Sequence, residues 1–288
     1  MSSPGGAQAD LAEAVRAGNV VRVAALLDAA PERIRDQTDA GRGLLSLAVR
    51  AGHLDVLLLL LERGADPTWP DEDAPRGRAL HDAARAGRRD MVDALLAHGA
   101  DPNVHVNASG NAVYAAAPFP EIRALLEARG GTLDPYDLVW LDEDDEVLRR
   151  VTADPASADA GCGGVYTAVV TRGKRALLMR LLDAGIRVPA APSGCRSYLL
   201  EDLEMLQLLL ARAGLDPDYV DDTGSTLLHS LALSGEADAV RVRGCAEALL
   251  AAGADRDARN ADGLTPADLA RRHNTTHLLP LLTGGRAE

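Results

Sequence analysis

The sequence predicts an all-α fold, a solenoid of about nine short helix pairs with irregular units in its middle. First, the apolar content is aliphatic, because hydrophobic residues make up 47% of the 288 residues and aromatic ones only 3%. Leu and Ala favour helices and let them pack closely. Second, similar segments recur, with Gly64 and Gly99 marking an offset of 35 residues. Third, a glycine follows each of the clearest expected helices. A short helix pair buries its apolar face only by stacking on its neighbours.

The clearest units share an opening motif, a Leu-Leu pair and a Gly-Ala-Asp turn. They cover residues 44–67, 79–103, 226–255 and 262–270, and the full turn occurs at 64–66, 99–101 and 253–255. Openings of the Thr-Pro-Leu-His type are matched in part by Thr265-Pro266, Leu80-His81 and Thr226-Leu227-Leu228-His229. These residues resemble the ankyrin repeat family. The resemblance implies that His81 and His229 hydrogen-bond to backbone groups of adjacent hairpins.

Each element of the expected unit has a local cause. The opening Thr caps a helix N-terminus, and Pro is tolerated in the first turn. A left-handed glycine after the first helix lets the chain reverse. Such glycines are Gly18, Gly52, Gly87, Gly173 and Gly235. The second helix carries the leucines and ends at another glycine by the same means.

In order along the chain, residues 1–288 are expected to form a single ankyrin repeat domain. Clear repeats are expected at about 8–131 and 221–282, and degenerate repeats at about 132–220. We expect the helices of 112–131 to be shortened by Pro118 and Pro120, and 198–214 to lack a clear first helix. The irregular middle has two explanations, specialisation for binding or a bend in the solenoid.

Charge and cysteine content exclude several classes of function. The net charge of −13, from 43 acidic and 30 basic residues, disfavours nucleic acids and anionic membranes as partners. It favours a basic protein partner, or it serves solubility alone. The most hydrophobic unbroken run, 56–61, is too short to span a bilayer, and we expect no signal peptide at the N-terminus. Three widely spaced cysteines, Cys162, Cys195 and Cys245, indicate reduced thiols in a cytoplasmic protein.

The resemblance implies that a partner binds the concave face and the loop tips. A tryptophan beside acidic residues is typical of an interaction hot spot. The candidate partner-binding residues are Trp69, Asp71, Glu72 and Asp73 in one loop, Arg50, Asp82 and Arg85 on first helices, and Trp140, Asp144, Tyr219 and Asp221 further along. Each has a plainer alternative. Trp69 folds over a neighbouring loop, the acidic run 142–146 is a solvated helix start, and loop aspartates cap turns.

The sequence therefore predicts a non-catalytic, monomeric scaffold for protein–protein interaction, such as an adaptor, inhibitor or immunity protein. No catalytic residues, cofactor or metal site are predicted, because nucleophile, phosphate-binding and metal-ligand motifs are missing from the sequence. The Ala, Arg, Asp and Leu bias is typical of high-GC bacterial genomes. The alternative is an enzyme or small-molecule-binding protein with a pocket in the irregular middle, although an open solenoid rarely provides a closed pocket.

Overall fold

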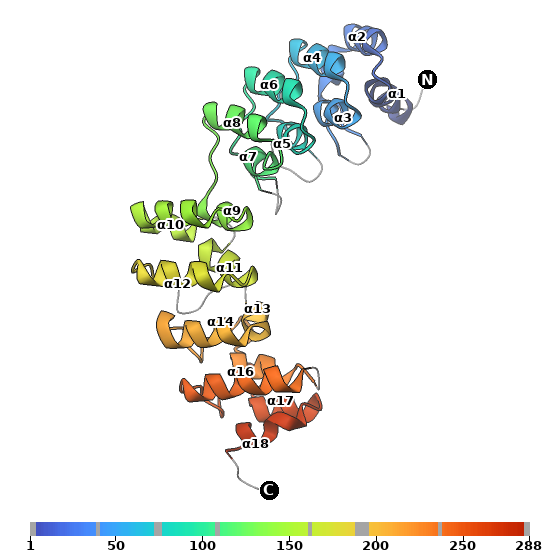
Figure 1. Ribbon diagram of the computed structural model, residues 1–288. Helices are drawn as coiled ribbons and strands as arrows, with labels where there is room; N and C mark the ends of the chain where they lie inside the picture. The colour runs from blue at the N-terminus through green and yellow to red at the C-terminus, as the bar shows by residue number, and fades with distance from the viewer. Residues whose placement is uncertain are drawn as a thin grey trace. The chain divides into compact units, whose positions relative to one another are not determined.

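The computed structural model describes residues 4–38, 41–71, 77–106, 110–160, 163–187, 196–235 and 238–284 (Figure 1). Within these ranges the regular structure is helical, and an isolated antiparallel bridge joins Gln37 to Gly43. The predicted all-α class is confirmed. Among the described residues, no helix is both long enough and apolar enough to cross a lipid bilayer. The chain forms two compact units, Met1–Leu133 and Asp134–Glu288.

The first unit consists of successive antiparallel helix pairs. Its helices are α1 (Pro4–Arg16), α2 (Val20–Ala29), the 3-10 helix η1 (Pro31–Arg35), α3 (Leu44–Ala51), α4 (Leu54–Glu62), α5 (Arg78–Arg85), α6 (Arg89–Ala97), α7 (Ala112–Ala115) and α8 (Pro120–Ala128). Each first helix packs on the next in the row α1, α3, α5 and α7, and the second helices do the same in the row α2, α4, α6 and α8. These two rows form the layered arrangement that the repeated motifs predict for 8–131.

The second unit is also built of short helices that pack in pairs. Its helices are α9 (Pro135–Trp140), α10 (Asp144–Ala153), η3 (Pro155–Asp159), α11 (Gly164–Thr171), α12 (Arg175–Asp183), α13 (Arg196–Glu201), α14 (Leu203–Leu208), the π-helical turn η4 (Leu209–Ala213), α15 (Leu227–Ala232), α16 (Ala239–Ala251), α17 (Pro266–Arg272), η5 (Thr276–Leu278) and α18 (Leu279–Leu282). The first helices α9, α11, α13, α15 and α17 contact one another in that order.

Aliphatic side chains form the core between neighbouring pairs. Leu57, Leu60 and Leu95 on the second helices are fully buried, as are the alanines Ala48 and Ala83 on the first helices. Small residues on the first helices let those helices approach closely, and the leucines fill the space between the rows. This is the division of roles that the sequence predicts.

Glycines between the two helices of a pair give room to the next repeat. Gly18 and Gly87 are left-handed, with φ of 69° and 70°. A Cβ atom on Gly18 would lie 2.6 Å from the His53 ring, and one on Gly87 would lie 2.6 Å from the Phe119 ring. The glycine therefore both reverses the chain and accepts a side chain from the following pair.

The histidine of the opening motif joins adjacent repeats in the second unit. His229 is fully buried; its Nδ1 accepts a hydrogen bond from the Thr226 amide at 3.1 Å, and its Nε2 lies 2.9 Å from the carbonyl oxygen of Leu264. Because Leu264 lies in the next hairpin, this contact confirms the role that the ankyrin resemblance implies for His229.

The irregular units differ from the expectations at two points. Helix α7 is only 4 residues long, consistent with the predicted shortening before Pro118, but α8 has 9 residues, as many as α4 and α6, so it is not shortened. Residues 198–214, however, do have a first helix, because α13 forms with Leu199 and Leu200 buried. The expectation that a clear first helix is missing there was wrong. A single buried Leu-Leu pair provides enough apolar contact for one and a half turns, even without the opening motif.

Candidate functional site

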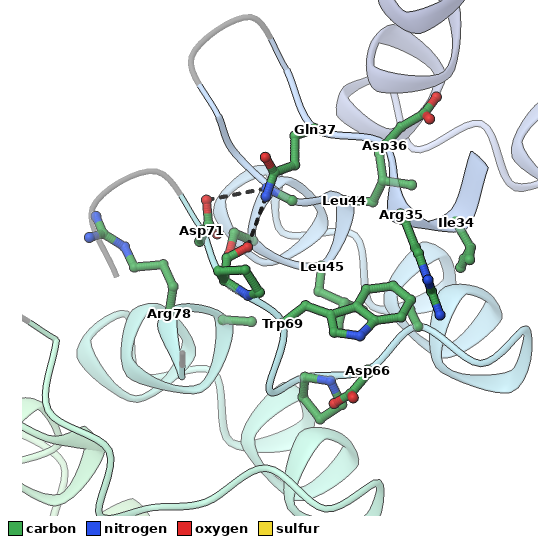
Figure 2. Close-up of a pocket in the computed structure, with 16 residues that line it drawn as sticks. Ile34, Arg35, Asp36, Gln37, Leu44, Leu45, Asp66, Trp69, Asp71 and Arg78 are labelled. Atoms are coloured by element: carbon green, nitrogen blue, oxygen red, sulfur yellow. Dashed lines mark hydrogen bonds between the residues drawn. The ribbon is translucent and has the colours of Figure 1, made fainter. Parts of the chain in front are cut away.

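A cavity of about 400 Å³ lies at the loop edge of the first unit (Figure 2). The indole of Trp69, from the loop after α4, forms part of its wall. Leu44 and Leu45 at the start of α3 line it, together with Ala65 and Ala79. The lining therefore combines aliphatic and aromatic side chains with charged ones such as Arg35, Asp36 and Arg78. Such a lining suits a buried apolar side chain.

Hydrogen bonds between consecutive loops fix the shape of this cavity. Gln37 donates from its side-chain amide to the carbonyl oxygen of Pro70 at 2.9 Å, and the Gly43 amide donates to the Asp71 carboxylate at 3.2 Å. The Trp69 amide donates to the carbonyl oxygen of Asp66 at 3.2 Å. The loop that carries Trp69 is thus fastened to the preceding hairpin, which orients the indole before any partner arrives.

Trp69 lies beside an arginine of the preceding repeat. The Arg35 guanidinium carbon is 5.1 Å from the ring centroid, within the range of a cation–π interaction (Figure 2). The indole is half-buried. It therefore rests on a neighbouring segment, as the plainer alternative proposes, and also lines the cavity. Glu72 and Asp73, expected to continue its acidic rim, lie outside the described residues.

The first-helix candidates divide into two exposed arginines and one buried aspartate. Arg50 and Arg85 are exposed. Asp82 is 4% exposed, and its carboxylate accepts a hydrogen bond from Arg78 Nε at 3.3 Å. Burial by itself would raise the pKa of Asp82, but the His81 hydrogen bond and the Arg78 charge outweigh it and lower that pKa. Asp82 is thus buried, and its carboxylate serves an ion pair inside the fold.

The acidic run of the second unit is neutralised within the protein. Asp142 lies 2.8 Å from the Lys174 ammonium and 3.0 Å from the Arg172 guanidinium, and Lys174 also pairs with Asp144. Asp145 pairs with Arg180 at 2.6 Å. Arg172, Lys174 and Arg180 belong to the next helix pair, so the run joins two repeats.

Glu146, the last residue of the run, pairs within its own helix. Its carboxylate accepts hydrogen bonds from Arg149 and from Arg150, at 2.7 and 2.6 Å for the two Nε atoms. Hydrogen bonds from Arg149 and then Arg150 lower the pKa of Glu146 to about 2. Asp144 and its acidic neighbours also begin α10, where the helix dipole favours negative charge.

The two remaining aromatic candidates are also covered by arginines. Trp140 is half-buried, with the Arg172 guanidinium carbon 5.4 Å from its ring. Tyr219 has Arg196 at 5.3 Å. Asp221 accepts hydrogen bonds from the backbone amides of Thr223 at 2.9 Å and Ser225 at 3.0 Å, so it shapes its own turn. Each of these candidates has a structural role in the fold.

The motifs of the sequence did not identify the three arginines that stack on candidate aromatic residues, Arg35, Arg172 and Arg196. Arg35 and Trp69 are 34 positions apart, and Trp140 and Arg172 are 32 positions apart. Both separations are close to one repeat, and residues one repeat apart lie side by side in a stacked array. Looking for an arginine one repeat before or after each aromatic residue would have identified both pairs. Arg196, 23 positions before Tyr219, gives no such signal.

A comparison with known protein families identifies the segment that holds the cavity. The family model described as ankyrin repeats, three copies, matches residues 11–106. Residues 11–106 contain ankyrin repeats. They include every residue that lines the cavity, as well as Arg50 and Arg85. No curated protein matches the chain. Ankyrin repeats are typically non-catalytic and indicate protein–protein interaction.

Proposed function

We propose that this protein is a non-catalytic scaffold that binds a protein partner through the loop edge and first helices of its ankyrin segment. One observation carries the proposal: Trp69 and aliphatic side chains line a cavity in that segment. Hot spots of protein interfaces are enriched in tryptophan and arginine and lie in well-packed pockets. Here a half-buried tryptophan, an arginine and an apolar floor are already assembled.

The composition of the cavity supports binding over catalysis. Its volume is near the lower limit for small-molecule pockets, which suits one or two side chains of a partner. Among the lining residues that the structure describes there is no histidine or cysteine. Its charged residues are tied to the fold in several cases, with Asp71 bonded to the Gly43 amide and Arg78 to Asp82. The cavity therefore offers shape and apolar area.

We also propose that the second unit consists of the same kind of repeat, which brings the chain to about nine helix pairs. The Gly-Ala-Asp turn at 253–255 and the bond from His229 to the next hairpin support this. In this proposal Trp140, Asp144, Tyr219 and Asp221 mainly join repeats, and the first contact with a partner is made around Trp69. Adaptor, inhibitor and immunity roles all use such a surface.

The test compares two tryptophan truncations of the full chain in affinity capture from cells that express the protein. Trp69→Ala removes the cavity wall, and Trp140→Ala makes the same chemical change in the second unit. We expect Trp69→Ala to reduce the captured partner at least tenfold, and Trp140→Ala to retain it. Circular dichroism confirms that both variants are folded. Equal retention by both variants would overturn the proposed surface.

A further inference from the structure

Three exposed arginines occupy equivalent positions in the first three repeats. Arg16, Arg50 and Arg85 each lie in the last turn of a first helix, in α1, α3 and α5. Each stands two positions before a left-handed glycine, in the sequence Ala-Val-Arg-Ala-Gly or Ala-Ala-Arg-Ala-Gly. We refer to Arg16, Arg50 and Arg85 as the arginine column.

The packing of the helices places these three side chains in one row. Helix α1 contacts α3, and α3 contacts α5, so equivalent positions follow one another along the layer (Figure 1). Helices packed in this way lie about 10 Å apart. The column therefore presents three guanidinium groups at a regular interval of about that length.

Two of the three arginines are not committed to an ion pair within the described residues. Within the described residues, Arg16 and Arg50 form no ion pair, and Arg85 is 3.7 Å from the buried Asp82. On the second helices, Arg63 pairs with Asp28 at 2.6 Å and Arg129 pairs with Asp93 at 3.0 Å. Arginine near a helix C-terminus gains about 0.3–1 kcal/mol from the helix dipole. That gain does not explain why a chain with a surplus of acids leaves Arg16 and Arg50 without an ion pair within the described residues.

We propose that the arginine column binds an extended acidic segment of the protein partner, with a carboxylate at every third residue. A segment in the polyproline II conformation completes one turn in three residues and rises about 9 Å, so every third side chain lies on the same side and meets the next arginine. Arginine binds carboxylates through paired, charge-assisted hydrogen bonds. This inference rests on the proposed function and names the chemistry of the partner.

The net charge of −13 does not oppose this assignment. At physiological salt, charges on the surface are screened over about 8 Å, so a bound segment senses mainly the groups beside it. Exposed acids of the same helix pairs include Glu13 on α1, Asp55 at the start of α4 and Asp90 at the start of α6. Within the described residues none of them forms an ion pair with the column. The charge that a bound segment senses is therefore set by the column and these acids, and not by the net charge of the chain.

The test measures fluorescence polarisation of labelled peptides with the full chain at low and at physiological salt. The probe is a ten-residue peptide with glutamate at every third position and serine elsewhere. Its counterparts carry lysine, or serine alone, at the same positions. We expect the glutamate peptide to bind at least tenfold more tightly than either counterpart, and its binding to weaken as salt rises.

Two variants with equal charge locate the binding site. Arg16→Gln, Arg50→Gln and Arg85→Gln together should weaken binding of the glutamate peptide at least tenfold. The control, Arg187→Gln, Arg243→Gln and Arg272→Gln together, removes three exposed arginines of the second unit and should change binding less than twofold.

Preference for the lysine peptide, equal weakening by both triple variants, or no binding of the glutamate peptide at millimolar concentration would overturn the assignment. The proposed function is judged separately by Trp69→Ala, which leaves all three arginines in place. Loss of partner capture in Trp69→Ala, with no peptide binding by the wild type, would reject the column and retain the scaffold.

Discussion

The helix pairs α5–α6 of the first unit and α9–α10 of the second use one position of the repeat in opposite ways. In the first unit, a left-handed glycine after the first helix receives a side chain from the next pair, as Gly87 receives Phe119. In the second unit, Asp142 takes the left-handed position with φ of 61°, and Lys174 of the next pair packs against it at 2.8 Å. Close packing in the first of these pairs is replaced by an ion pair in the second, although Gly173 and Gly235 keep a left-handed glycine elsewhere in the second unit.

The ion pairs of Asp142 and its neighbours also explain why the surroundings of Trp69 and of Trp140 have different roles, although they contain similar residues. Trp69 and Trp140 each have an arginine on the ring and acids nearby. Around Trp140 the acids form ion pairs with Arg172 and Lys174, and these ion pairs join neighbouring repeats. Around Trp69 the structure provides a cavity. A run of acids is therefore informative about binding only after the neighbouring repeat has been examined for partners.

The largest effect is expected where the glycine position is filled. Gly87→Ala places a Cβ atom at a left-handed residue, which costs about 1–2 kcal/mol, and also against the Phe119 ring. We expect the free energy of unfolding to fall by about 2–3 kcal/mol, measured by urea denaturation.

Gly64→Ala is the matched control for this substitution. Gly64 is also left-handed, with φ of 86°, but nothing lies within 4 Å of its Cβ position. In Gly64→Ala the free energy of unfolding should fall only by the cost of the left-handed backbone, about 1 kcal/mol. Equal losses in the two variants would show that contact with the next repeat adds nothing at Gly87.

A smaller loss of stability is expected when the ion pair between Lys174 and Asp142 is broken. Lys174 is the single lysine of the chain, and its side chain is 12% exposed between Asp142 and Asp144. Burial would lower the pKa of Lys174, but hydrogen bonds to Asp142 and Asp144 outweigh it and raise that pKa. Lys174→Met should cost about 1 kcal/mol at low salt and less at high salt.

Restoring the arrangement of the first unit sharpens this prediction. Asp142→Gly relieves the left-handed backbone and removes one carboxylate from Lys174. If Asp142 stabilises the fold through its ion pair with Lys174, then Lys174→Met should lower the free energy of unfolding less in the Asp142→Gly background than in the wild type. A double-mutant cycle in urea measures this difference. Strict additivity would contradict a coupled pair.

The reactivity of the lysine gives an independent measurement. A burial-protected ammonium with a raised pKa is seldom in the neutral form that attacks acylating reagents. We expect Lys174 to be acylated several-fold more slowly in the folded wild type than in Asp142→Asn combined with Asp144→Asn, as followed by mass spectrometry. Because the chain contains no other lysine, the only competing amine is the N-terminus. Equal acylation rates in the wild type and in the double variant would contradict the protection of Lys174 by Asp142 and Asp144.

Much of the fold could be predicted from the sequence because its signals are local. A Leu-Leu pair and a glycine act within one helix pair, so they located the repeats of 44–67 and 79–103 correctly. Long-range compensation escaped prediction. Asp142 stands at the glycine position and pairs with Lys174, one repeat further on, and neither residue alone indicates this.

The candidate site was predictable in part for the same reason. Trp69 was found because a tryptophan in an enlarged loop is conspicuous in the sequence. The burial of Asp82 was not found, because a helical position between motif residues faces either outward or toward a neighbouring side chain such as Arg78. Which of the two occurs depends on the packing of the whole layer.

The smallest effect is expected from the pH dependence of the acidic run. The pKa of Glu146 is lowered from its ordinary value to about 2 by Arg149 and Arg150. A depressed pKa in the folded state adds stability above the pKa of the unfolded chain, about 4.3, and this stability is lost as the pH falls toward 2. Because Arg149 is exposed, we expect a contribution under about 1 kcal/mol at neutral pH.

Glu146→Gln isolates this contribution. The variant should unfold at a lower urea concentration than the wild type at pH 7, and the difference should shrink between about pH 4.5 and pH 2, where the wild-type carboxylate gains its proton. Glu62→Gln, at an exposed glutamate of the first unit for which the described residues show no ion pair, should leave the midpoint nearly unchanged throughout. A gap that persists undiminished at pH 2 would mean that Glu146 stabilises α10 by packing. That result would weaken the contrast between ion pairs in the second unit and close packing in the first.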